Sequence, residues 1–274
     1  MSQYVLIVIA GDPAIRVRTA PCRRSSTVRE PSSPPRRAKA LGQVPGVAIR
    51  KPVTDERIAS MTAPFGPLFG LRVHTERLEL RLPTQADLDA VADLSFDGIH
   101  DPMVQPFSEG WTDAAPEERA RGTMQYHWSK WAAWRASDWT LTLVAVKDDV
   151  VVGTQEMRGR DFDVLREVSS GSWLGREYQG KGIGTEMRAA VLHLAFAGLG
   201  AEYATSFASE DNVASLSVSR KFGYDSDGIE RRCVRGRPAV FRRLRLDRTT
   251  WGDRRLHPVS IDGLDSCLPY FGLG

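Results

Sequence analysis

The apolar residues of this chain alternate between the period of a strand and the period of a helix. Residues 77–83 alternate apolar and polar side chains, as a half-buried strand does. Residues 84–96 repeat apolar side chains every three to four positions, and Thr84 stands where a helix N-cap is expected. A second helical pattern covers residues 116–136, where three tryptophans at three-residue spacing indicate packing in a core or in a homodimer.

The next pattern is that of a β-hairpin. Two β-rich runs, at residues 139–147 and 150–158, flank the acidic pair Asp148 and Asp149, which suits a two-residue turn. Further elements are expected as a strand at 168–175, a helix after Gly184, a strand at 201–209, a helix at 212–223 and a final strand at 239–246. This order predicts one mixed α/β domain over residues 61–274, with a short C-terminal extension.

Residues 1–60 differ in composition from the rest of the chain. They hold 11 Lys and Arg against 4 Asp and Glu, and 7 of the 16 prolines. Without apolar periodicity we expect this leader to be disordered, either as a tail without catalytic function or as sequence upstream of a true start at Met61. A basic tail for nucleic acid or membranes is the alternative, but interleaved aromatic residues are missing. The remaining residues carry a net charge of −4, which favours a cationic substrate.

Several classes of protein are disfavoured by the sequence. No apolar run is long enough to span a bilayer, and the early run at residues 4–10 lacks the basic residues of a secretory signal. Cys22, Cys233 and Cys267 are too scattered to indicate a disulfide framework or a zinc site. We therefore expect a cytoplasmic protein that binds no metal, no membrane and no nucleic acid.

The strand at 168–175 runs into a glycine-rich loop, "YQGKGIGTEM", at residues 178–187. The spacing does not match a P-loop, because Lys181 lies inside the loop, and a dinucleotide fingerprint fails because Thr185 stands at its sixth position. Glycines allow a ligand to approach the backbone, and the first amides of the following helix lie at its positive dipole end. The loop therefore indicates either the binding of a pyrophosphate or a purely structural turn.

The loop and the later "DNVASLSVSRKFGY" together resemble the acyl-CoA-binding core of the GNAT superfamily of N-acyltransferases. The flanking "HTERLELRLPTQAD" and "RLRLDRTTW" are similar to the subgroup that acetylates N-termini of ribosomal proteins, so the resemblance covers residues 71–251. "GIHDP", "PFSEGW" and "SGSWLG" resemble an actinobacterial branch that includes a mycobacterial succinyltransferase. The resemblance implies a GNAT fold, in which helices flank a mixed, mostly antiparallel sheet that splays at the acyl-CoA site.

The resemblance also assigns residues to the acyl-CoA site. It places a strand at Trp173 and Leu174 beside the pantetheine arm, and Asn212 and Ser215 near that arm. Many family members have a tyrosine acid where this chain has Ser219, so Ser215 becomes the preferred acid or thioester-positioning residue. The pyrophosphate loop implied by the family consists of Gln179, Gly180, Lys181, Gly182, Gly184 and Thr185.

The resemblance implies direct transfer of an acetyl or succinyl group from acetyl-CoA or succinyl-CoA to an amine, without a covalent intermediate. The candidates for a general base are Glu177, Glu156, His100 and Asp101. A succinyl donor would require a cation, for which Arg158, Arg160, Lys130 and Arg176 are candidates. The acceptor stays open between a protein N-terminus, a lysine and a small amine. A catalytically silent acyl-CoA sensor of the same fold is the alternative.

Overall fold

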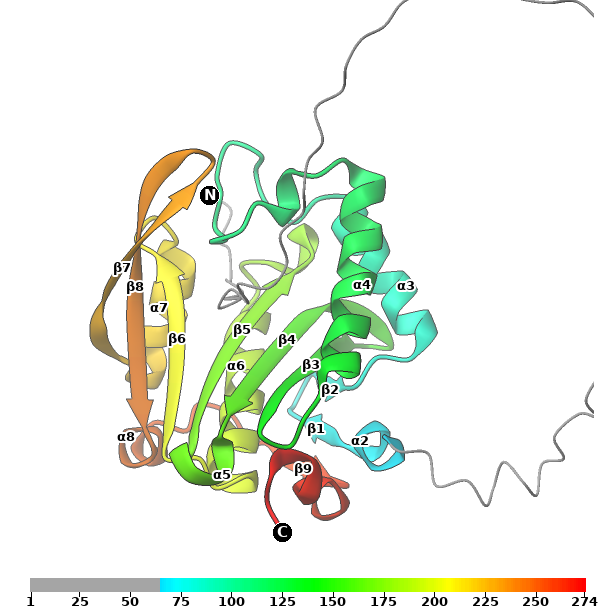
Figure 1. The fold of residues 1–274 in the computed structure, drawn as a ribbon, viewed down its shortest axis with the longest axis vertical. Coiled ribbons are helices and arrows are strands. Elements are labelled where there is room, and N and C mark those ends of the chain that lie inside the picture. Colours follow the sequence, from blue (N-terminus) through cyan, green and yellow to red (C-terminus); the bar gives the residue numbers. More distant parts are fainter. Residues whose placement is uncertain (1–64) are drawn as a thin grey trace, which may run out of the picture. The chain divides into compact units, whose positions relative to one another are not determined.

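The computed structural model describes residues 65–274, so the predicted leader and the start at Met61 lie outside the described residues. The centre of the fold is a nine-stranded sheet with the order β7-β8-β6-β5-β4-β3-β2-β1-β9 (Figure 1). Its strands are β1 (Arg72–His74), β2 (Glu79–Arg81), β3 (Asp138–Lys147), β4 (Val150–Arg160), β5 (Glu167–Leu174), β6 (Tyr203–Ser209), β7 (Asp225–Val234), β8 (Arg237–Asp247) and β9 (Ser260–Asp262). The helices are α2 (Gly66–Gly70), α3 (Gln85–Phe96), α4 (Pro116–Ala133), α5 (Phe162–Leu165), α6 (Ile183–His193), α7 (Val213–Phe222) and α8 (Arg248–Asp253).

The pairing of β5 with β6 is the feature that shapes the sheet. Every other neighbouring pair is antiparallel, whereas β5 and β6 run parallel. Their pairing stops at Ser169 and Thr205, although β5 continues to Leu174 and β6 to Ser209. Beyond this point, which we call the fork, the two strands diverge (Figure 1). The mixed, mostly antiparallel and splayed sheet predicted from the sequence is thereby confirmed.

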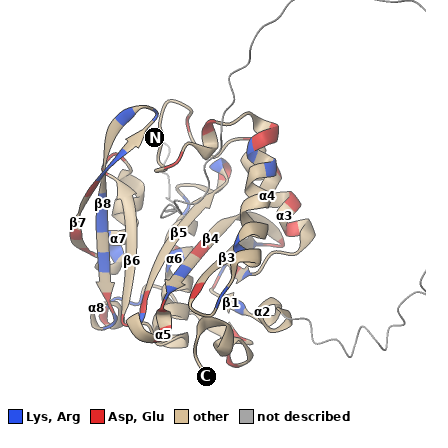
Figure 2. Cartoon of the chain, viewed as in Figure 1, with Lys and Arg blue, Asp and Glu red and all other residues tan. Residues whose placement is uncertain are grey.

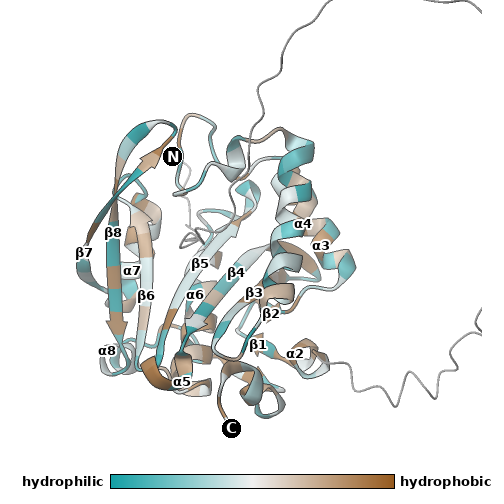
Figure 3. Ribbon diagram, in the orientation of Figure 1, coloured by the Kyte–Doolittle hydropathy of each residue, from teal (hydrophilic) through white to brown (hydrophobic). Residues whose placement is uncertain are grey.

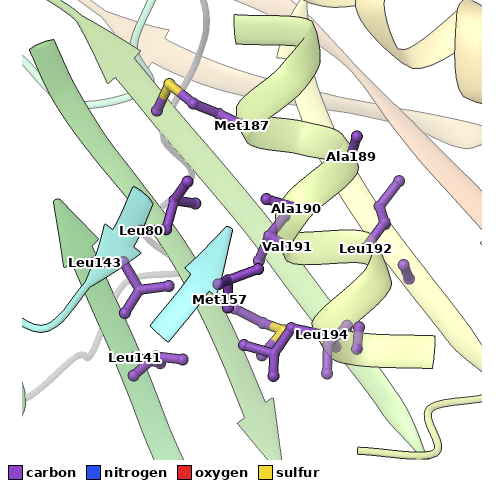
Figure 4. Packing of buried hydrophobic residues seen from close by; sticks show 14 of the residues in the cluster. Leu80, Leu141, Leu143, Met157, Met187, Ala189, Ala190, Val191, Leu192 and Leu194 are labelled. Carbon is purple, nitrogen blue, oxygen red and sulfur yellow. The ribbon is translucent and has the colours of Figure 1, made fainter. Parts of the chain in front are cut away.

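Helices pack on both faces of the sheet. On one face, Met187 and Val191 of α6 and Leu194 of the turn after it pack on apolar side chains of the central strands, among them Leu143 and Met157 (Figure 4). Helices α3 and α4 lie over the other face beside β3 and β4 (Figure 1). Since side chains alternate along a strand, β3, β4 and β5 present apolar residues to α6 and free their opposite face for other contacts.

Local sequence signals form the turns and helix ends as expected. Thr84 caps α3, because its hydroxyl accepts the amide of Asp87 while the Asp87 carboxylate accepts the amide of Thr84. Asp148 and Asp149 both have positive φ, as a tight hairpin turn requires. Gly182 has φ +80° and ends the glycine-rich loop at the start of α6.

Three predictions about elements need correction. The helix of residues 116–136 ends at Ala133, because Trp134 leaves helical geometry. The strand of residues 77–83 is only Glu79–Arg81, and the strand 239–246 is not the last one, since β9 follows and pairs with β1. Strand β7 was not predicted from the sequence, because none of its residues is buried and it lacks the alternation of apolar residues. Among residues 65–274, no helix has the length and apolar character needed to cross a membrane.

Candidate functional site

A cavity of about 310 Å³ opens between α4 and the face of the sheet opposite α6. Its walls come from α4, from the segment before α4, and from β3, β4 and β5. The lining residues are Glu109, Trp111, Ala114, Glu118, Arg119, Gly122, Thr123, Tyr126, His127, Thr142, Thr154, Gln155, Glu156 and Trp173. The cavity thus combines mainly apolar and aromatic walls with a few acidic and hydroxyl groups, a composition typical of a small-molecule site.

Glu156 is the buried carboxylate of this cavity. Only 6 % of the residue is exposed, and burial raises the pKa of its carboxyl to about 7. The Tyr126 hydroxyl donates a hydrogen bond to this carboxylate, and Lys130 and Arg158 oppose the rise in its pKa through their positive charge. Glu156 therefore exchanges its proton near neutral pH, which is the property of a general base.

The strand register explains why Glu156 reaches the cavity. Glu156 is paired with Thr142 on β3 and with Gly171 on β5, whereas its neighbour Met157 points to α6. Gly171 lies two residues beyond Ser169, the last residue of β5 that pairs with β6. The candidate base is thus held next to the fork.

Two further polar groups of the cavity have unused hydrogen-bonding capacity. The Thr142 hydroxyl is buried and makes no hydrogen bond within residues 65–274, and the same holds for Nδ1 of His127. Burial lowers the pKa of His127 to about 4, so this imidazole is neutral at physiological pH. Both side chains can therefore contact a ligand without introducing charge.

The glycine-rich loop is fixed to the turn between β1 and β2 by an ion pair between the exposed Arg77 and the buried Glu186. Glu186, in the first turn of α6, accepts hydrogen bonds from the Thr75 hydroxyl at 2.6 Å and from the amide and Nε of Arg77 at 2.9 and 2.7 Å. The Nη1 of Arg77 also reaches the carbonyl of Lys181 at 3.3 Å. These contacts hold the loop in shape while Gly180 and Gly182 leave its surface open.

The other predicted loop residues divide into anchors and exposed groups. The Gln179 amide donates to the carbonyls of Ile99 at 2.8 Å and Leu174 at 2.9 Å, so its side chain fastens the loop. Lys181 is exposed, Thr185 is half-buried, and Gly184 is buried in the first turn of α6. The first amides of α6 have no partner inside the helix, and they can bind an anion at this point.

A row of buried polar atoms follows the start of α7. Asn212 caps the helix, its Oδ1 accepting the amide of Ser215 at 3.0 Å. Its Nδ2 and the hydroxyls of Ser215 and Ser219 have no hydrogen-bond partner in the described part of the chain. Unpaired buried polar groups are costly, so this row fits a ligand that supplies amide and carbonyl groups, as a pantetheine arm does. Together with the open glycine loop, these residues can hold an acyl-CoA.

The other predicted residues lie at different places. Trp173 lines the cavity, while Leu174 is buried in the core.

Three other candidate bases lie away from Glu156. Glu177 is exposed on a short 3-10 turn. Asp101 is also exposed, and its Oδ1 accepts a hydrogen bond from the amide of Met103 at 2.9 Å. His100 is buried, and its Nδ1 lies 2.9 Å from the carbonyl of Asp101. These last three residues do not line the cavity with Glu156.

The cations considered for a succinyl donor do not line this cavity either. Arg158 and Arg160 both form ion pairs with Asp138, and the Lys130 ammonium lies 4.8 Å from the centre of the Tyr126 ring. Arg176 lines a separate cavity near Asp97 and Arg235.

Tyr126 is a site residue that sequence reasoning missed. It lies on α4, 30 residues before Glu156, and the helical pattern there carries no sign that a polar side chain faces the sheet. An acid within a β-rich run is a weak signal for a buried carboxylate, and this signal did identify Glu156 as a candidate.

Comparisons with known proteins agree with this architecture. The acetyltransferase (GNAT) domain family matches residues 77–225, more than half of the chain. Among solved structures, RimJ of Mycobacterium smegmatis in complex with CoA-disulfide has 20% identity and a TM-score of 0.54, covering 65% of this chain and 85% of its own. A GCN5-related N-acetyltransferase of Brucella melitensis has 16% identity and a TM-score of 0.54, with coverages of 67% and 81%.

A third solved structure is RimL, a ribosomal L7/L12 alpha-N-protein acetyltransferase in complex with coenzyme A. It has 16% identity and a TM-score of 0.50, covering 63% of this chain and 95% of its own. At these identities the solved structures support the fold, whereas the family match extends over the glycine loop and α7. The chain therefore belongs to the GNAT acetyltransferase family.

Proposed function

We propose that this protein transfers an acyl group from acyl-CoA to a primary amine bound in the cavity, with Glu156 as the general base. Acyl-CoA supplies the activated acyl group as a thioester. The amine nitrogen forms the new C–N bond, the thioester C–S bond breaks, and Glu156 accepts the proton that the nitrogen loses. The observation that carries this proposal is a buried carboxylate with a pKa of about 7 in a cavity beside the fork.

The proposed acceptor is a cationic amine, because the walls of the cavity are acidic. Glu109 and Glu118 are exposed carboxylates on these walls, and no ion pair within residues 65–274 neutralises them. The single lining cation, Arg119, donates to four backbone carbonyls, among them those of Phe96 at 2.6 Å and Ala114 at 3.2 Å. A protein N-terminus, a lysine or a small amine would each be attracted.

Transfer in this proposal is direct, since the described cysteines are poorly suited to carry an acyl group. Cys233 is exposed on β7, and Cys267 is buried, with burial raising the pKa of its thiol. Neither residue lines the cavity with Glu156. The Ser215 hydroxyl has no other partner among the described residues, so it can donate to the departing sulfur or position the thioester.

The pH dependence of the rate tests the role of Glu156. We expect kcat/KM to rise with pH through about 7, because the carboxylate is the active form and burial raises its pKa to that value. Replacing Tyr126 by Phe should move this limb to higher pH, because the Tyr126 hydroxyl donates to the charged carboxylate and lowers its pKa. The measurement is initial rate against pH with saturating acyl-CoA for both proteins.

An N-terminal amine contributes its own ionisation at a pKa of about 8, so the profile is also recorded with Glu156→Gln. The pH profile of Glu156→Gln should keep the rise caused by deprotonation of the acceptor amine and lose the rise near pH 7 caused by Glu156. If the wild-type limb near 7 persisted in Glu156→Gln, another group would be the base. If no acceptor were acylated by a protein that binds acyl-CoA, the silent sensor would replace the transferase as the better description.

A further inference from the structure

A buried arginine at the fork has no acidic partner. Arg188, in the second turn of α6, is only 1 % exposed. Its recorded contacts are a hydrogen bond from Nη1 to the Ser206 hydroxyl at 3.3 Å and a cation–π contact of 5.8 Å with the ring of Tyr224. Its Nε has no hydrogen-bond partner in residues 65–274, and none of the ion pairs in this range includes it.

A guanidinium in this environment is energetically unfavourable. Arginine stays charged in proteins, and taking an unpaired charge out of water is costly even after the surroundings relax. Arg188 offers five N–H donors in a planar fork that matches a carboxylate, and one hydroxyl uses one of them. The site therefore has the chemistry of a binding place for an anion that the chain itself does not provide.

The elements that pack on α6, among them β5 and α7, carry several unpaired hydroxyl groups. Ser206 is the first residue of β6 beyond the fork, and the parallel register brings Ser170 of β5 to the same level. The hydroxyls of Ser170, Ser172, Ser219 and Tyr224 are buried and have no partner among the described residues. Such hydroxyls can donate to the remaining lone pairs of a bound carboxylate.

The position of Arg188 defines which anion would reach it. Ser206 faces the same side of the sheet as its neighbours Ala204 and Ala208, and Ala204 packs in the cluster that includes α6. Glu156 points to the opposite side, into the cavity. The two residues thus approach the fork from opposite faces, one with a base and the other with a cation. An acyl group that enters the fork would have its reactive carbon on the side of Glu156 and its distal end on the side of Arg188.

We propose that Arg188 binds the distal carboxylate of a dicarboxylic acyl donor, so that succinyl-CoA is preferred over acyl-CoAs with an uncharged acyl group. The inference rests on the acyl-CoA site of the proposed function. Arg188 was not among the cations considered from the sequence. Those four residues pair with Asp138 (Arg158 and Arg160), lie over the Tyr126 ring (Lys130) or line a separate cavity (Arg176). The buried guanidinium of Arg188 would then serve to bind the donor rather than to stabilise the fold.

The test compares the binding of succinyl-CoA and butyryl-CoA, whose acyl groups have the same number of carbons, by calorimetry. We expect wild-type protein to bind succinyl-CoA at least ten times more tightly, and Arg188→Met to bind the two within a factor of about two. Arg220→Met is the matched control, because Arg220 is exposed on α7, and it should keep the wild-type ratio. Equal binding of the two thioesters by the wild type would overturn the inference.

Thermal unfolding of the free proteins separates ligand binding from a structural role. A guanidinium kept for a ligand should make Arg188→Met as stable as the wild type or more stable, because an unpaired buried charge is removed. A variant with a clearly lower Tm that weakens both thioesters equally would assign Arg188 a structural role and overturn the inference. If succinyl-CoA bound selectively but no amine were acylated, the carboxylate site would stand and the transferase proposal would fail.

Discussion

Replacing Glu156 by Gln is expected to lower kcat/KM by about 10²- to 10⁴-fold, the range over which a positioned general base contributes to catalysis. Gln has nearly the shape of Glu but cannot accept the proton of the attacking amine. The carboxylate is 6 % exposed and accepts a hydrogen bond from Tyr126, so the substitution also leaves this hydroxyl with an amide oxygen as acceptor and preserves the packing. Steady-state rates with a cationic amine and succinyl-CoA or acetyl-CoA measure the effect.

The affinity of Glu156→Gln for acyl-CoA should stay at the wild-type level while kcat/KM falls, because the glycine loop and the row of polar atoms on α7 are unchanged. Glu117→Gln is the matched control: Glu117 is exposed in the first turn of α4 and does not line the cavity, so its rate should stay at the wild-type level. A decrease of less than about threefold in Glu156→Gln would remove Glu156 from the role of base. Exposed carboxylates such as Glu177 would then have to be tested in its place.

The elements that the sequence predicted correctly are those that depend on local interactions. Thr84 and Asp87 cap α3 from within four residues, and Asp148 with Asp149 forms the tight turn of the hairpin between the two β-rich runs. Strand β7 lacks such a signal. Figure 3 shows hydrophilic residues along β7 and β8, and β7 is held mainly by its pairing with β8. A strand without buried apolar residues cannot be recognised by apolar periodicity.

The candidate site likewise has a part that depends on local sequence and a part that depends on tertiary packing. The glycine loop is contiguous in the sequence, so its spacing alone could indicate either an anion site or a structural turn. The cavity is formed by residues from α4 and from three strands, and its key pair, Tyr126 with Glu156, exists only because α4 packs on that face of the sheet. Figure 2 shows a basic and an acidic segment on β4, but the burial of the acid depends on tertiary packing. Arg188 lies within a regular helical run, and its isolation from acids cannot be read from the sequence.

Replacing Gly182 by Trp is expected to weaken acyl-CoA binding by about 100-fold or more. Gly182 adopts φ +80° directly before α6, and a Cβ built there meets only the end of the Arg77 side chain, at 3.5 Å. The indole therefore projects into the space over the loop, where the pyrophosphate would contact the first amides of α6. Positive φ adds strain of about 1–2 kcal/mol, which lowers stability but does not by itself block a ligand. Calorimetric titration with coenzyme A measures the affinity.

Two further variants separate the bulk of the indole from the strain of the backbone. Gly182→Ala carries the strain with little bulk, so it should bind coenzyme A far better than Gly182→Trp. Gly236→Trp places the same indole on another glycine with positive φ, in the β7–β8 turn, where a Cβ meets nothing within 4 Å, and its affinity should match the wild type. If Gly182→Trp bound coenzyme A as well as these controls, the glycine-rich loop would be a structural turn. The anion site would then have to lie elsewhere along α6 or α7. The position of a bound thioester between Glu156 and Arg188 could then no longer be inferred from the loop.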